Sequence, residues 1–239
     1  MSGRVRRARG LVARRLPDRV IRLVRPARWG NLRRLEPFNR SWGFDRGTPV
    51  DRVFIDDFCR RHAADVRGRA AEVKDPSYIR RFGGPAVVRE DVVDIDAANP
   101  EATIVADLAE PGSLPAGRFD CFLLLQTLQL VGDARLALAN CWESLAPGGV
   151  LLVTVPSMSK LDTESTGRDR WRFTPDGLAD LLRAACPGAE LDVAGYGNVC
   201  TAVAFLLGLA AEELTERELG FHDPDFPVLS AGRARKKAV

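Results

Sequence analysis

Five carboxylates of this chain follow short apolar runs closely enough to gather at one edge of a sheet. They are Glu72 and Asp75 after a first run, Asp94 and Asp96 after a second, and Asp107 after a third. Ligands of parallel sheets bind at the carboxyl ends of the strands. An acid after the second strand could accept hydrogen bonds from both hydroxyls of a ribose, and one after the third could face an adenine amino group. The pattern predicts a nucleoside site, with helix caps or solvated loop charges as the open alternative.

Other catalytic signatures are missing from the sequence. It has no phosphate-binding loop, no nucleophile elbow, no HExxH and no pair of cysteines at metal-binding spacing. The five cysteines lie far apart, at Cys59, Cys121, Cys141, Cys186 and Cys200. We therefore expect neither a disulfide framework nor a metal centre.

The elements that must position the acids alternate between strands and helices. Strands are predicted at 68–73, 87–96, 103–108, 119–125, 150–155, 191–194 and 226–235. Helices are predicted at 49–64, 134–145, 176–185 and 199–214, with Thr48 and Thr174 as N-caps and a turn at 146–149. This alternation predicts an α/β fold, in which one mostly parallel sheet carries helices on both faces and ends in an antiparallel strand.

The composition is that of a globular chain. Of its 239 residues, 46% are hydrophobic and 28% are charged, which suits a core that needs no covalent staple. No apolar run approaches the ~18 residues of a membrane span, and neither end resembles a secretory signal. We expect a cytoplasmic protein, with peripheral membrane association as an open alternative.

Charge divides the chain into two parts. Residues 1–34 hold twelve arginines and one acid, whereas the rest carries 23 basic and 31 acidic residues, a net charge of −8. Apolar residues interleave with these arginines at near-helical spacing. We therefore predict a basic amphipathic arm over residues 1–35 and one domain over residues 36–239. The expected target of the arm is an anionic membrane surface or a partner protein, and the alternative is a solvated leader; no nucleic acid is expected.

One block of the sequence carries a resemblance to a known family. It consists of Phe119-Asp120, the apolar strand that follows, Gln126-Thr-Leu-Gln-Leu130, Asp133 and Leu145-Ala-Pro-Gly-Gly-Val-Leu-Leu-Val-Thr-Val-Pro156. The block resembles the fourth strand, next helix and fifth strand of class I S-adenosylmethionine-dependent methyltransferases. The similarity extends over about residues 68–185. Shorter motifs, such as Arg46-Gly-Thr-Pro49 and Trp171-Arg-Phe-Thr174, resemble a bacterial branch associated with glycosyltransferase or natural-product pathways.

The resemblance implies a Rossmann-like fold and S-adenosylmethionine as cofactor. It places Asp96 at the ribose hydroxyls, with Asp94 as the alternative, and Asp107 or Leu108 at the adenine. The residues that would border the rest of the cofactor are Glu72, Asp75 and Gln126.

The implied reaction is methyl transfer to a small-molecule, sugar or natural-product acceptor. If the acceptor needs a general base, His222 and Tyr196 have suitable chemistry. Trp171 and Arg172 could contact the acceptor, since an aromatic side chain beside arginine suits a sugar or an anion. Core packing or capping is the alternative role for these residues.

Lys74 departs from the family pattern, because it stands where the first glycine of a glycine-rich loop is expected. Its ammonium could block the methionine pocket, pair with Asp75, Asp96 or Glu72, or point into water. We therefore expect weak binding of S-adenosylmethionine or none. The second hypothesis is a methyltransferase fold that transfers no methyl group and instead binds a partner or catalyses another reaction, such as a cyclisation or elimination.

Overall fold

The computed structural model describes residues 30–163 and 169–238. The chain divides into two compact units, Met1–Glu36 and Pro37–Val239. In the first unit, Gly30–Leu32 forms the 3-10 turn η1. Apart from residues 30–35, the predicted basic arm lies outside the described residues.

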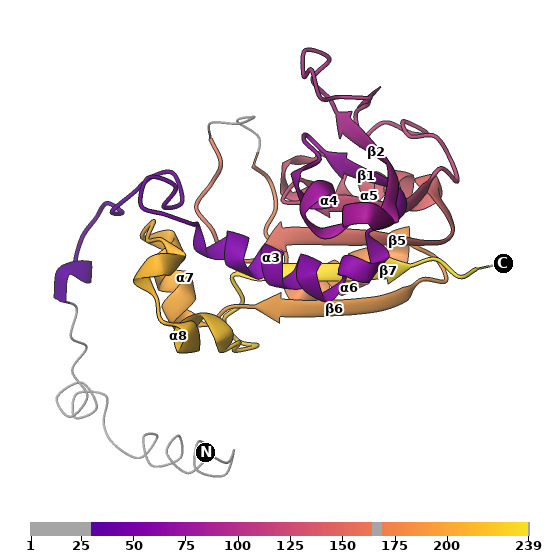
Figure 1. The fold of residues 1–239 in the computed structure, drawn as a ribbon. Coiled ribbons are helices and arrows are strands. Elements are labelled where there is room, and N and C mark those ends of the chain that lie inside the picture. Colours follow the sequence, from indigo (N-terminus) through magenta and orange to yellow (C-terminus); the bar gives the residue numbers. More distant parts are fainter. Residues whose placement is uncertain (1–29, 164–168, 239) are drawn as a thin grey trace, which may run out of the picture. The chain divides into compact units, whose positions relative to one another are not determined.

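A seven-stranded sheet organises the second unit (Figure 1). Its strands are β1 Gly68–Val73, β2 Val87–Asp94, β3 Ile104–Val105, β4 Phe119–Leu125, β5 Leu145–Pro156, β6 Glu190–Tyr196 and β7 Leu229–Arg235. Their order across the sheet is β3-β2-β1-β4-β5-β7-β6. β7 is antiparallel to both of its neighbours, and the other pairings are parallel. The predicted mostly parallel sheet with an antiparallel last strand is confirmed.

Helices cover both faces of this sheet. They are α3 Val50–Arg61, α4 Ser77–Phe82, α5 Ala134–Ser144, α6 Pro175–Ala185, α7 Val199–Leu206 and α8 Glu216–Gly220, with 3-10 turns η2 Ala63–Asp65, η3 Gly84–Ala86, η4 Leu128–Leu130 and η5 Ala211–Glu213. Successive side chains of a strand point to opposite faces. Accordingly, Phe122 packs in a cluster with residues of α5 and α6, whereas Leu123 packs with residues of α3, α4 and α7. Figure 1 shows α3 running across its face of the sheet.

Two helix predictions need correction. Both concern contacts between the loop over residues 37–48 and the segment that follows α7. Thr48 is not the N-cap of α3; Pro49 occupies that position, and the Thr48 hydroxyl donates to Glu212 at 2.7 Å instead. The helix predicted at 199–214 ends at Leu206. Gly208 then adopts a φ of +69° and packs against the Asn39 carbonyl, which redirects the chain. Thr174, by contrast, caps α6 as predicted, accepting the amide of Gly177.

The strands also differ in extent from the sequence prediction. The turn expected at 146–149 lies inside β5, where the pairing register with β4 shifts between Phe119↔Leu145 and Cys121↔Val150. β3 is reduced to two residues, and the six-residue α4 is the α-helix between β1 and β2. The connections from β1 to β2 and from β2 to β3 thus carry no long helix.

Candidate functional site

The chain turns at Lys74 directly after β1, with a φ of +78°. Glycine adopts this left-handed conformation readily, whereas other L-residues do so at a cost. The Lys74 amide donates to the Val93 carbonyl of β2 at 3.0 Å. The backbone therefore has the conformation of a glycine turn although the residue carries a side chain. That side chain is exposed, and the described residues place no carboxylate within ion-pair distance of its ammonium, so Lys74 points into water.

Asn99 joins this turn to the end of β2. Its side-chain nitrogen donates to the Lys74 carbonyl at 2.7 Å and to the Asp94 carboxylate at 2.6 Å. Its side-chain oxygen accepts the Glu101 amide at 3.0 Å. One amide thus fixes the distance between the β1 turn and the β2 carboxylate. No sequence motif marks Asn99 as a functional residue, because an asparagine before proline signals only a turn.

The carboxylate at the end of β2 is Asp94 rather than Asp96. β2 ends at Asp94, and the second oxygen of this side chain accepts the Asp96 amide at 3.0 Å. Asp96 lies two residues beyond the strand, where its exposed carboxylate accepts the Ala98 amide at 2.9 Å. The structure therefore places the alternative residue, and not the first choice, at the strand end.

Two of the remaining acids form local turns. Asp107 accepts the Ala109 amide at 2.8 Å, and Asp75 accepts the Ser77 amide at 3.1 Å. Leu108 is buried, and its carbonyl accepts the side-chain amide of Asn140 at 2.9 Å. The described hydrogen bonds of these two carboxylates are thus turn contacts within their own loops, and neither residue caps a helix.

Glu72 faces α4. Its carboxylate is buried within β1 and accepts the amides of Ile79 at 2.9 Å and Tyr78 at 3.3 Å. Burial raises the pKa of Glu72 to about 8, although the two amides act in the opposite direction. Both oxygens are therefore engaged by the first turn of α4, which removes Glu72 from the set of free acids at the edge.

Two glutamines after β4 leave polar atoms unsatisfied. Gln126 adopts a φ of +48°, and its amide donates to the Thr154 carbonyl at 2.9 Å. The side chain of Gln129, which is 8% exposed, donates to the Gln126 carbonyl at 2.8 Å. Within the described residues, Nε2 of Gln126 and Oε1 of Gln129 are buried without partners. Such groups carry a desolvation penalty that a polar ligand or a water would relieve.

The segment after β5 returns over η4. The Arg170 amide donates to the Gln129 carbonyl at 2.9 Å, and the Trp171 indole donates to the Val131 carbonyl at 2.9 Å. Trp171 stays 42% exposed, but Arg172 is ion-paired with Asp169. An anionic acceptor would therefore have to compete with Asp169 for Arg172.

The loop over residues 37–48 reaches the same end of β5. The Trp42 indole donates to the Ser159 hydroxyl at 3.1 Å, and the Lys160 ammonium lies 3.4 Å from the centre of the Trp42 ring. Trp42 itself has a φ of +55°. Local sequence patterns do not indicate this contact, because the partners are more than a hundred residues apart.

His222 and Tyr196 come together, with ring centroids 5.2 Å apart, and both contact Phe54. His222 Nδ1 accepts the Gly197 amide at 3.1 Å, so the neutral ring carries its proton on Nε2. Burial lowers the pKa of His222 and raises that of Tyr196. The described contacts of this pair are those of core packing.

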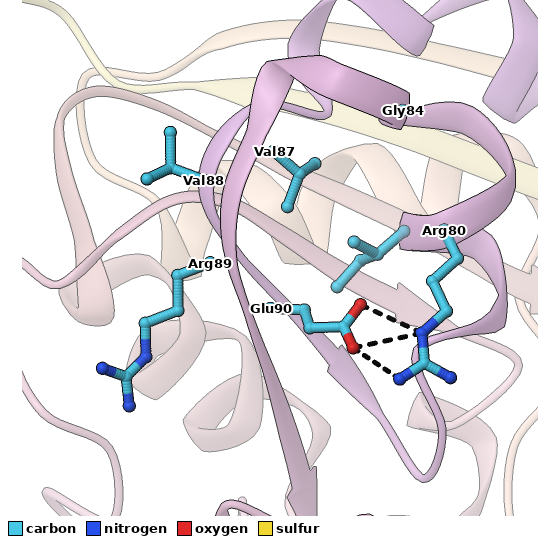
Figure 2. Close-up of a pocket in the computed structure, with 7 residues that line it drawn as sticks. Arg80, Gly84, Val87, Val88, Arg89 and Glu90 are labelled. Atoms are coloured by element: carbon cyan, nitrogen blue, oxygen red, sulfur yellow. Dashed lines mark hydrogen bonds and ion pairs between the residues drawn. The ribbon is translucent and has the colours of Figure 1, made fainter.

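A cavity of about 360 Å³ lies elsewhere, beside the amino-terminal half of β2 (Figure 2). Its lining residues are Ile79, Arg80, Gly84, Val87, Val88, Arg89 and Glu90. Figure 2 shows Arg80 hydrogen-bonded to Glu90 and Arg89 directed away from that pair. This cavity lies beside the amino-terminal end of β2, whereas Asp94 lies at the carboxyl end of the same strand.

Neither a membrane-crossing helix nor a metal site occurs among the described residues. None of the described helices is long and apolar enough to span a membrane. Among the described residues, no three histidine, cysteine or acidic side chains lie close enough together to hold a metal ion.

No protein-family model matches the sequence, and no curated protein matches it. Solved structures do match. An S-adenosylmethionine-dependent methyltransferase from Mesorhizobium loti has a TM-score of 0.52 at 16% identity, over 81% of this chain and 100% of that one. The N-methyltransferase NodS from Bradyrhizobium japonicum, solved with S-adenosylhomocysteine, has a TM-score of 0.51 at 14% identity, over 83% and 93% of the chains. The [4+2]-cyclase SpnF has a TM-score of 0.52 at 18% identity, over 85% and 87%.

At such identities the likeness concerns the fold. The seven-stranded, mostly parallel sheet and its helices match the Rossmann-like architecture of these neighbours. The chain therefore has the fold of the class I S-adenosylmethionine-dependent methyltransferases.

Proposed function

We propose that this protein binds S-adenosylmethionine at the carboxyl edge of β1, β2 and β4 and transfers the methyl group to a small-molecule acceptor. The observation that carries the proposal is the link made by Asn99. It holds a left-handed turn after β1 and a carboxylate at the end of β2 in one rigid arrangement, at the edge where sheets of this kind bind nucleosides.

The residues at this edge fit the nucleoside half of the cofactor. Asp94 would accept the ribose hydroxyls, because a carboxylate oxygen that already accepts one hydrogen bond can accept another. Asp107 and Leu108 would lie on the adenine side. The unsatisfied amide of Gln126 supplies a donor to a polar group of the ligand.

The cofactor would supply a methyl group on a positively charged sulfur, ready for in-line displacement. The chain would position the acceptor and exclude water. His222 and Tyr196 pack against each other and Phe54, so we assign neither of them a role in the transfer.

The acceptor class is inferred from the exposed side of this edge. Trp171 presents an accessible indole, which suits the apolar face of a sugar or of a natural product. Arg172 is engaged by Asp169, so we place it as a support for Trp171 rather than as an anion contact.

The decisive experiment is calorimetric titration with S-adenosylmethionine and S-adenosylhomocysteine, together with thermal shift. A ligand at 100 times its Kd adds about 2.7 kcal/mol of stability. Asp94→Asn should weaken binding at least tenfold. The matched control is Asp180→Asn, an exposed acid on α6 whose described ion pair is with Arg183. Binding that is unaffected by Asp94→Asn would contradict the assigned site, and lack of binding to either ligand would contradict the function.

A specific observation favours a second function, a methyltransferase fold without methyl transfer. The Glu72 carboxylate is engaged by the amides of α4, and Lys74 stands at a left-handed position where the glycine-rich loop of the family would have a glycine. Such a protein could catalyse another reaction at the same edge or bind a partner. Tight binding of S-adenosylhomocysteine without turnover on any acceptor in a mixture of small molecules would support this alternative.

A further inference from the structure

Three arginines surround one buried carboxylate near the amino-terminal ends of β1, β2 and β4. Arg69 is near the start of β1, Arg89 is near the start of β2, and Arg118 precedes β4. Arg69 and Arg89 are paired in the register of the two strands, which puts both side chains on one face. Asp91, two residues after Arg89, lies on that same face and is 1% exposed.

Only one of these arginines hydrogen-bonds to Asp91. Arg69 donates from Nε and Nη2 at 2.6 and 3.0 Å. The ion-pair distances from Arg89 and Arg118 to Asp91 are 3.7 and 3.6 Å, which is beyond hydrogen-bond range. Asp120 nearby accepts the backbone amide of Arg69, not a guanidinium. Three cations thus face the carboxylates of Asp91 and Asp120, which leaves a formal surplus of one positive charge.

The guanidinium of Arg118 is held in place and yet lacks an acceptor. Its carbon lies 6.0 Å from the centre of the buried Phe119 ring, and the Arg69 guanidinium lies 5.9 Å from the same ring. The backbone amide of Arg118 donates to the Ser144 carbonyl at 2.7 Å. Its Nε is buried with no hydrogen-bond partner among the described residues. Solvent reaches the cluster, because the side chains of Arg89 and Arg118 are 61% and 34% exposed.

We propose that Arg89 and Arg118 bind a phosphate group beside Asp91. A guanidinium presents paired N–H donors that match the oxygens of a phosphate, and the negative charge of a phosphate would offset the positive surplus. The Arg69–Asp91 pair and Phe119 form the fixed support behind the site. Inorganic phosphate, a soluble phosphate monoester and the headgroup of a phosphomonoester lipid all offer this chemistry. The site lies at the opposite edge from Asp94 and is independent of the proposed function.

The test is a titration of the full chain with inorganic phosphate at constant ionic strength. We expect saturable binding that Arg89→Gln and Arg118→Gln each weaken at least tenfold. Arg183→Gln is the matched control, since it removes an exposed arginine that is paired with Asp180 on α6. The affinity for S-adenosylhomocysteine should stay the same in all four proteins, which separates this site from the carboxyl edge.

Equal phosphate affinity in the wild type and both variants would overturn the proposal and indicate an adventitious ion only. If Arg118→Gln fails to fold, the more exposed Arg89 decides the outcome alone. Vesicles of phosphatidylcholine with and without phosphatidic acid distinguish the sources. Arg89-dependent binding to phosphatidic acid without binding to free phosphate assigns a lipid, and lack of any Arg89-dependent binding in both arms overturns the site.

Discussion

Replacing Lys74 by glycine should change both the free energy of unfolding and the affinity for S-adenosylmethionine, for two different physical reasons. A left-handed backbone costs a residue with a Cβ roughly 1–2 kcal/mol, and Lys74 has a φ of +78°. Glycine avoids this strain but loses roughly 0.5–1 kcal/mol of backbone entropy on folding. We expect a net gain of about 1 kcal/mol in the free energy of unfolding. For a chain of this length, that raises the Tm by about 2–4 °C.

The same substitution removes a positive charge near the expected position of the sulfonium. Two unit charges 4 Å apart repel by about 1 kcal/mol in water, and the exposure of Lys74 puts it near this limit. The Kd of S-adenosylmethionine should therefore fall about fivefold. S-adenosylhomocysteine has a neutral sulfur, so its Kd should change less.

Lys74→Ala separates the two effects in the same titrations and thermal melts. Alanine removes the charge but keeps a Cβ at the left-handed position, so the affinity should rise without the gain in Tm. The reasoning is refuted if both variants bind both ligands like the wild type, because Lys74 would then lie outside the pocket. A drop in Tm for Lys74→Gly would likewise show that the turn is unstrained.

The remaining predictions concern positioning, pH and the loop over residues 37–48. Asn99→Ala should weaken cofactor binding about tenfold in calorimetry and lower the free energy of unfolding by about 1–2 kcal/mol, because it removes three side-chain hydrogen bonds. Folding raises the pKa of Glu72 from 4.5 to about 8, so between these pH values the folded state binds one proton more than the unfolded state. The free energy of unfolding should therefore fall as the pH rises from 4.5 to about 8. Urea unfolding at several pH values should show a weaker pH dependence for Glu72→Gln. Gly208→Ala would push a Cβ against the Asn39 carbonyl at a φ of +69° and should lose at least about 2 kcal/mol more than Gly188→Ala, whose φ is +73° in open space.

Local sequence signals predicted the fold well where neighbours in the chain make the decisive contacts. Strand β4 is an apolar run because both of its faces are covered, and such a pattern is legible in the sequence. The Thr174 cap succeeds because its acceptor geometry involves only the next three residues. The Thr48 cap fails, and both the amide and the hydroxyl of Thr48 donate instead to Glu212, a contact across 164 residues that local sequence does not encode.

The sequence indicated which carboxylates follow the strands but not their hydrogen-bond partners. The expectation that carboxylates follow the strands is met at Asp94, since strand ends are set by patterns in the chain. The partners of each carboxylate depend on where loops pack, which the sequence does not encode locally. Glu72 therefore turned out to hold α4, and Asn99, which no motif marks, turned out to join two strands.

These contacts divide the edge into two halves with different chemistry. On the side proposed for the nucleoside, Asp94 keeps room for further hydrogen bonds, and Asn99 holds it in place. On the side proposed for the methionine, Glu72 has both oxygens engaged, and the Lys74 ammonium would repel a cationic sulfur. In the proposed site, S-adenosylmethionine would therefore gain its interactions mainly through the ribose and adenine, and methyl transfer would depend on the side where Glu72 and Lys74 lie. Substitutions at Lys74 thus test whether the proposed site supports methyl transfer or nucleoside binding alone.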